Sequence, residues 1–109
     1  MKHATLWLVS ALAFTTYGGV WAEEITAPQT RQLVKLVRQD CGSCHGLTLK
    51  GGLGSPLLPA TLADKPVESL VATILHGRPG TAMPPWQGLL TEQEAQWIVE
   101  HLQAGFPQE

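Results

Sequence analysis

The chain contains the stretch Cys41-Gly42-Ser43-Cys44-His45, and its other segments are best understood in relation to it. Two thiols three positions apart lie within one turn of backbone, so both can form thioethers with the two vinyl groups on one edge of a porphyrin. The imidazole of His45 then lies beneath the metal and can bind iron as the proximal ligand. The motif therefore predicts one covalently attached haem c, bound through Cys41 and Cys44, with His45 as a metal ligand.

Three other interpretations of this motif remain. A thioredoxin-like dithiol belongs at the start of a helix in a βαβ unit, and no strand pattern flanks the motif here. A structural zinc site needs four ligands, whereas this chain has two cysteines and no closely spaced histidine pair. A plain disulfide would be strained at this spacing. Of these, the redox dithiol is the main competitor of haem.

The first 22 residues have the pattern of a secretory signal peptide. Met1-Lys2-His3 is a basic start, Ala4 to Phe14 is an almost uninterrupted apolar run, and Val20-Trp21-Ala22 suits a signal peptidase. Cleavage after Ala22 predicts a periplasmic protein. The alternative is an uncleaved anchor, but the apolar run is shorter than the ~20 residues that span a bilayer, and no later stretch could cross a membrane.

The remaining residues 23–109 form one small domain of 87 residues. A chain of this size usually needs a cofactor, metal or disulfide to complete its interior, and a haem would supply that apolar volume. All nine acidic residues but only six of the seven basic ones remain after cleavage, so the net charge becomes −3. Because no basic patch is present, nucleic-acid binding is excluded.

Helical signals predict an all-α domain of about three helices. The first runs from about Ala27 into the haem motif, and Thr26 with Gln29 forms its capping box. The second begins at Pro66 and ends at Gly77, since Pro79 prevents its continuation. The third begins at Thr91, which forms a capping box with Glu94, and ends at Gly105.

Between Gly46 and Lys65 the helical periodicity disappears and glycines and prolines alternate with leucines. This composition predicts an Ω-type loop whose five leucines cover an apolar surface, such as a haem face. The alternative is a flexible linker, which would carry serine and charge in place of leucine. The five leucines are Leu47, Leu49, Leu53, Leu57 and Leu58.

Met83 is the candidate for the second axial ligand. It lies in Gly77-Arg78-Pro79-Gly80-Thr81-Ala82-Met83-Pro84-Pro85-Trp86, a loop that its prolines make rigid. The other methionine, Met1, is lost with the signal peptide, so a methionine that binds the iron of the mature protein must be Met83. The alternative is that Met83 fills a gap in the core, as methionines commonly do.

The order of these parts resembles the class I monohaem cytochromes c over essentially the whole mature chain. The resemblance implies a cytochrome c-like helical fold and places on Pro56 the carbonyl that accepts the N–H of the proximal histidine. The chain departs from the family at the crossing of its terminal helices. Leu33 and Val37 replace the usual glycine and aromatic residue, and His101 replaces the aromatic residue of the last helix.

The stretches 70–86 and 94–99 are more specifically similar to the small periplasmic cytochrome (NirC type) associated with the haem c and haem d₁ dissimilatory nitrite reductase. This resemblance implies a monomeric electron carrier that donates electrons to nitrite reductase in denitrification and receives its haem from the cytochrome c maturation machinery. The resemblance also implies that the protein is not an enzyme. Arg78 and the indole N–H of Trp86 are the expected donors to a haem propionate.

Two other functions stay open. One is a maturation factor that helps to assemble haem d₁ or to insert it into nitrite reductase, a role also proposed for this kind of cytochrome. The other is an exported thiol oxidoreductase that uses Cys41 and Cys44 as its dithiol. Two axial protein ligands would leave no open iron site for a substrate, which favours electron transfer.

Overall fold

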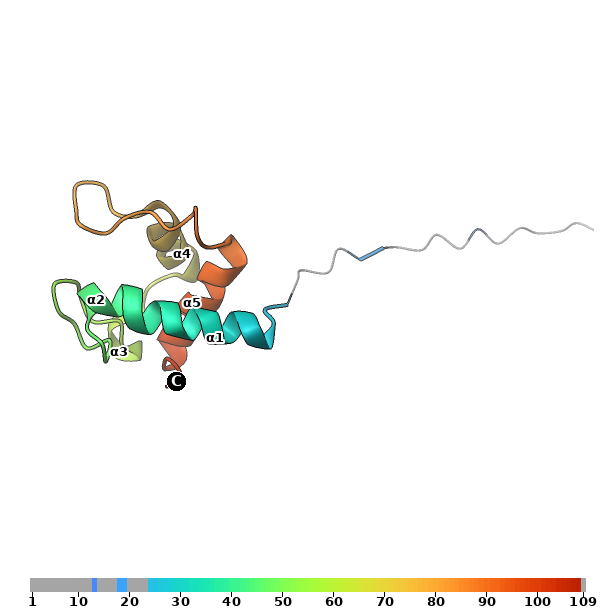
Figure 1. The fold of residues 1–109 in the computed structure, drawn as a ribbon. Coiled ribbons are helices and arrows are strands. Elements are labelled where there is room, and N and C mark those ends of the chain that lie inside the picture. The colour runs from blue at the N-terminus through green and yellow to red at the C-terminus, as the bar shows by residue number, and fades with distance from the viewer. Residues whose placement is uncertain (1–12, 14–17, 20–23, 109) are drawn as a thin grey trace, which may run out of the picture.

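The computed structural model describes residues 13, 18–19 and 24–108. The predicted signal peptide lies almost wholly outside these residues, as does Glu109. In the described part the regular structure is helical and there is no β-strand (Figure 1), which confirms the all-α class. The elements are α1 (Ala27–Leu36), η1 (Val37–Cys41), α2 (Gly42–His45), α3 (Pro59–Leu62), α4 (Val67–His76) and α5 (Glu92–Ala104).

The first helix runs without a break into the cysteine motif, as predicted. Its capping box is present, since Thr26 Oγ1 accepts the Gln29 amide at 3.3 Å and Gln29 Oε1 accepts the Thr26 amide at 2.9 Å. Between α1 and α2 the chain makes the wider π-helical turn η1, which inserts one extra residue per turn. The turn ends at Cys41, the first cysteine of the motif, and the helical periodicity did not predict it.

The first and last helices contribute to one apolar core. Leu33 and Val37 from the N-terminal segment are at most 2 % exposed and share a cluster with Ile98 and Leu102 of α5, which are at most 4 % exposed. Figure 1 shows α1 crossing α5. Branched side chains thus fill the contact where the family resemblance has glycine and an aromatic residue, and burial of each contributes about 1.5–3 kcal/mol.

A polar contact fastens the C-terminal segment to the π-helical turn η1. The Arg38 guanidinium donates to the carbonyls of Phe106 and Pro107 at 3.1 and 2.8 Å, and it lies 5.4 Å from the centre of the Phe106 ring. Trp97 meets the Phe106 ring edge-on, and the His101 ring stacks on Trp97 with centroids 3.8 Å apart. His101 therefore contributes a flat ring at the position where an aromatic residue was expected.

The short helix α3 lies inside the segment 46–65, which we expected to be irregular throughout. Its C-terminal end is held against α5, because Gln103 Nε2 donates to the carbonyls of Leu62 and Lys65 at 3.0 and 2.9 Å. A second small core joins α4 to α5 through Val71, Ala95 and Val99. Of the residues that the structure describes, none belongs to a helix long and apolar enough to cross a membrane.

Candidate functional site

Two neighbouring cavities lie between the cysteine motif and the loop that follows α4, with volumes of about 290 and 420 Å³. Each is of a size found in small-molecule sites. Both are lined by Cys41, His45, Ser55, Arg78 and Met83, so these residues lie along the boundary between the two cavities. Residues 42 positions apart in the sequence, Cys41 and Met83, are thereby brought to one site.

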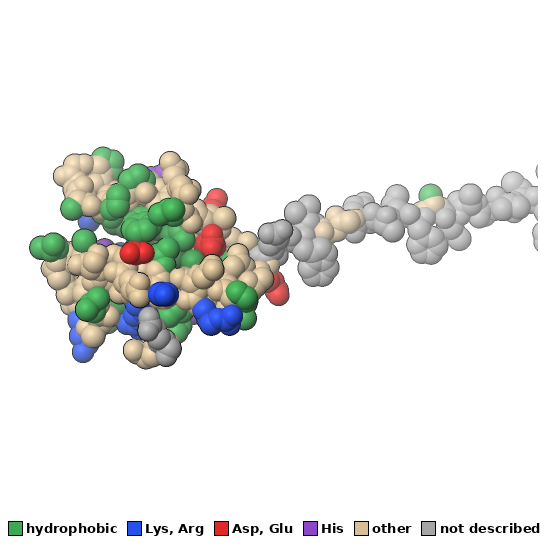
Figure 2. All heavy atoms as spheres, viewed as in Figure 1, with side chains coloured by type: hydrophobic (Ala, Val, Ile, Leu, Met, Phe, Trp, Pro, Cys, Tyr) green, Lys and Arg blue, Asp and Glu red, His purple; other side chains and the backbone are tan. Residues whose placement is uncertain are grey.

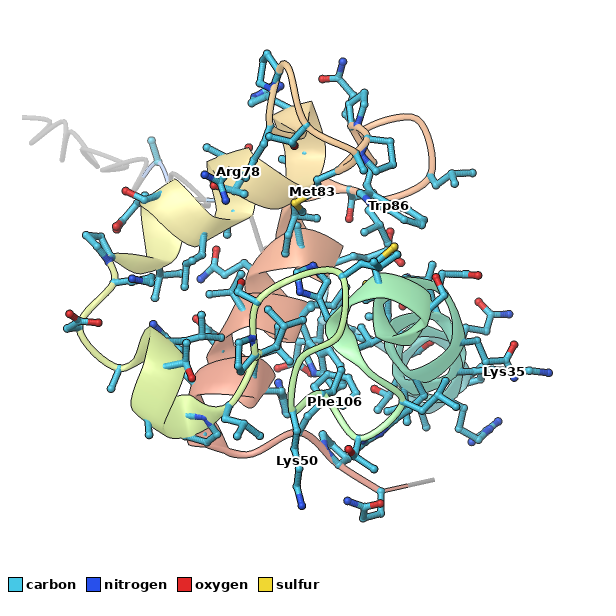
Figure 3. The ribbon with its side chains drawn as sticks, turned by 90° about the vertical axis from the view of Figure 1, so that its left-hand side faces the viewer. Lys35, Lys50, Arg78, Met83, Trp86 and Phe106 are labelled. Carbon is cyan, nitrogen blue, oxygen red and sulfur yellow. The ribbon has the colours of Figure 1, made fainter. Side chains whose placement is uncertain are left out.

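The loop from Gly77 to Trp86 is attached to the C-terminal end of α4 at both of its ends. The amides of Trp86 and Gln87 donate to the carbonyls of Ile74 and Leu75, each at 3.1 Å. Within the loop the Arg78 amide donates to the Met83 carbonyl at 3.2 Å. Figure 3 shows Arg78, Met83 and Trp86 on the same side of the site. The loop is therefore a defined turn, as its prolines predicted.

His45 is oriented by a hydrogen bond from its ring to the backbone. Nδ1 lies 2.7 Å from the carbonyl oxygen of Ser55, and because a carbonyl can only accept, Nδ1 must carry the proton. Nε2 then keeps its lone pair for a metal. The expectation that the Pro56 carbonyl accepts this bond is wrong by one residue, since a backbone turn determines which carbonyl faces the ring and the residue type does not.

Glycine allows the loop after the motif to approach the histidine closely. A Cβ at Gly54 would lie 2.7 Å from Cε1 and Nδ1 of the His45 ring, and a Cβ at Gly52 would lie 2.8 Å from the Cys44 carbonyl. The Gly54 amide in turn donates to that carbonyl at 2.8 Å. The sequence indicates only a loop at these glycines. The structure shows that Gly54 lets the backbone approach the His45 ring and that Gly52 lets it approach the Cys44 carbonyl.

The two cysteines differ in exposure, Cys41 being partly buried and Cys44 exposed. Burial, and after it the neighbouring Asp40 carboxylate, raises the pKa of the free Cys41 thiol from 9.0 to about 11. A dithiol oxidoreductase needs the opposite, a first cysteine whose lowered pKa makes it a thiolate near neutral pH. The environment of Cys41 therefore suits a cysteine that ends as an uncharged thioether.

Only some of the five leucines in the loop line the cavities, although we expected all of them to cover a haem face. Leu49 is 2 % exposed and belongs to the core, whereas Leu57 lines the larger cavity. Leu53 lines the smaller cavity at its mouth and is 95 % exposed. Leu47, 71 % exposed, and Leu58 line neither cavity. Figure 2 shows hydrophobic side chains gathered along the opening between α2 and the loop after α4.

These residues fit a haem c. The site offers two thiols, one imidazole with a free Nε2 and one thioether, and the larger cavity is lined mainly by apolar side chains such as Leu70, Ile74 and Val99. Within residues 24–108, no three His, Cys, Asp or Glu side chains gather as a metal-binding group. These donor atoms suit a covalently attached haem, and Arg78 and Trp86 line the smaller cavity together with Met83.

Comparison with known proteins agrees with this site. Residues 28–102 match the family model described as cytochrome c oxidase, cbb3-type, subunit III. The chain is 54 % identical to cytochrome c55X of Pseudomonas aeruginosa over 105 residues, which cover 95 % of this chain and 87 % of the relative. It is 48 % identical to cytochrome c55X of Stutzerimonas stutzeri over 107 residues, or 97 % and 95 % of the two chains.

Two solved structures are similar in fold. The structure titled c-type cytochrome NirC has a TM-score of 0.73 and 57 % identity, over 74 % of this chain and 95 % of that one. Dihydro-heme d1 dehydrogenase NirN in complex with DHE has a TM-score of 0.61 and 39 % identity, over 69 % of this chain but 16 % of the other. The relatives that match along most of their length are small cytochromes c, which carry electrons and are not enzymes. The chain therefore belongs to the cytochrome c family, as a small c55X or NirC-type electron-transfer cytochrome with covalently bound haem c.

Proposed function

We propose that the protein is a periplasmic carrier of single electrons whose one haem c is attached through Cys41 and Cys44 and ligated by His45 and Met83. The observation that carries this proposal is that both cavities share His45 and Met83, which come from different segments of the chain. A haem iron bound by both His45 and Met83 would have no open site for a substrate. The bound haem supplies the reversible one-electron change of its iron.

The side chains around the haem tune and protect it. The Ser55 carbonyl holds the His45 ring in one tautomer, which makes Nε2 a stronger ligand. A thioether from Met83 favours the ferrous state more than a second imidazole would. The apolar lining keeps water away from the iron. These three features favour a higher reduction potential than that of a haem with two histidine ligands.

The test combines mass spectrometry with the optical spectrum of the ferric protein. Covalent haem mass on the mature chain would exclude the thiol oxidoreductase, whose cysteines must stay free. The wild type should show the weak far-red band of sulfur bound to ferric iron, and Met83→Leu should lose it. Leu53→Ala, which changes the same cavity without removing a donor atom, should retain the band. A wild-type spectrum without the band would contradict ligation by Met83.

We further propose that the electrons go to the dissimilatory nitrite reductase of denitrification. The support is the likeness to cytochrome c55X and to the structure titled NirC. Removal of the signal peptide 1–22 leaves a net charge of −3, which provides only modest electrostatic steering toward a partner. Reduced protein mixed with oxidised nitrite reductase in a stopped-flow instrument should be oxidised with second-order kinetics that depend little on ionic strength.

A role in haem d₁ maturation is the second candidate. It is favoured by 39 % identity, over 74 residues, to the Pseudomonas aeruginosa protein named Dihydro-heme d1 dehydrogenase, of which this chain covers 15 %. A strain that lacks the protein separates the two functions when it is grown anaerobically on nitrite. If nitrite reductase from this strain contains haem d₁ but receives too few electrons in cells, the protein is an electron donor. If nitrite reductase from this strain lacks haem d₁, the protein is a maturation factor.

A further inference from the structure

The larger cavity has a cationic end that the expected site residues did not include. Lys65 lines this cavity but not the smaller one, whereas Cys44, Leu53 and Trp86 line the smaller cavity but not the larger. Lys65 therefore lies away from the second cysteine, at the other end of the site. In Figure 3 the turn between α3 and α4, which carries Lys65, is on the left and Trp86 is on the right.

Three hydrogen bonds hold the turn that carries Lys65, and two of them involve the Lys65 backbone. Its amide donates to the Leu62 carbonyl at 3.1 Å, and Gln103 Nε2 donates to the carbonyls of Leu62 and Lys65 at 3.0 and 2.9 Å. The turn is thus fastened to α5. The side chain is exposed and yet lines the cavity, as expected when an apolar stem covers apolar surface and the ammonium group stays at the boundary with water.

The charges that face the larger cavity all come from basic groups. Lys65 and Arg78 line it, together with the imidazole of His45 and the thiol of Cys41. No carboxylate is among its lining residues. Asp40 lines only the smaller cavity, at the thiol end. Asp64, next to Lys65, is exposed and lines neither cavity. Two cations at an apolar cavity without a carboxylate favour a bound dianion.

We propose that Lys65 binds a propionate of haem c and that Arg78 binds the other. A haem carries two propionates on the edge opposite its vinyl groups, and the vinyl carbons are the atoms that Cys41 and Cys44 bind. A haem bound through Cys41 and Cys44 would have its propionates on the edge away from Cys44, where Lys65 would be available to bind one of them. This assignment rests on the proposed haem site, and it moves the second propionate donor from Trp86 to Lys65.

Lys65 then acts as a positioning and tuning residue. Its positive charge opposes the extra positive charge of ferric iron, so it raises the reduction potential. It also stabilises the ionised propionate, which lowers the pKa of that carboxyl group. A lysine that only supports the turn between α3 and α4 would alter stability without these two effects.

The test measures the reduction potential of the intact holoprotein by spectroelectrochemical titration between pH 5 and 9 for Lys65→Gln, Lys65→Arg and Lys50→Gln. Lys50 is exposed and lines a separate surface hollow, so it is a matched control that removes one charge outside the haem site. Figure 3 shows Lys50 pointing away from Met83. All variants should fold, because Lys65 and Lys50 are exposed, and thermal unfolding checks this.

We expect Lys65→Gln to lower the potential more than Lys50→Gln and to move the pH dependence of the potential to higher pH. Lys65→Arg should keep both values close to wild type. Equal shifts for Lys65→Gln and Lys50→Gln, with an unchanged pH dependence, would overturn the proposal. The absence of covalent haem from the wild type would instead refute the proposed function, and mass spectrometry distinguishes the two failures.

Discussion

Gly77 determines how the methionine loop leaves helix α4, and Gly77→Ala should release it. Gly77 has φ +69° and ψ −170°, a region that is almost exclusive to glycine. A Cβ there would lie 2.8 Å from the Met83 carbonyl oxygen, from Pro84 C and from Pro85 N. All three are backbone atoms, so no side-chain rotation can relieve the contact.

The size of the effect follows from these two terms. An alanine in this backbone region costs about 1–3 kcal/mol, and forcing extra volume against fixed backbone costs about 1–3 kcal/mol more. Gly80→Ala is the matched control, since Gly80 has φ +78° but a Cβ there would meet nothing within 4 Å. It carries only the cost of the left-handed backbone, about 1–2 kcal/mol. Both variants therefore carry a backbone cost, and only Gly77→Ala adds the contact with the Met83 segment.

Urea unfolding of the holoprotein gives the free energies, and the far-red band of the ferric protein reports the methionine ligand. We expect Gly77→Ala to lose about 2–6 kcal/mol, from the sum of the two terms, together with part or all of the band. Gly80→Ala should keep the band. If both variants lost the same free energy and both kept the band, the close approach of Gly77 to Met83 would have no role in holding the ligand.

Three further predictions concern other parts of the domain. Gly54→Ala should push the His45 ring away from the Ser55 carbonyl, which should cost about 1–3 kcal/mol of stability and make the His45 Nδ1 proton exchange faster in NMR spectra. Gly88→Ala, where the added Cβ meets nothing within 4 Å, should change neither the stability nor the exchange rate. Ile98→Ala, at a side chain 1 % exposed, should destabilise the holoprotein by about 2–5 kcal/mol, whereas Leu89→Ala, at 74 % exposure, should stay within about 0.5 kcal/mol; equal losses would contradict the assigned core. Thr91→Ala should cost about 1 kcal/mol in urea unfolding because it removes the cap of α5, and Thr91→Ser should restore most of it.

Interactions between residues close in the sequence were predictable from the sequence alone. Both capping boxes, at Thr26 and Thr91, are present because each joins groups three residues apart, whatever the rest of the fold does. The end of α4 at Gly77 follows from glycine and proline chemistry within three residues. The cysteine motif also carries its chemistry locally, since two thiols and an imidazole within five residues already specify a haem attachment site.

Contacts between distant segments were decided by the tertiary structure. Which carbonyl meets His45, Ser55 rather than Pro56, depends on the path of a glycine-rich turn. Lys65 reaches the larger cavity because Gln103, 38 residues later, holds its turn against α5. Leu49 is buried while Leu53 is exposed, although both are leucines in one loop. Residue type and spacing describe the local backbone, but burial and approach across the chain depend on how the helices pack, and that packing has no local signature.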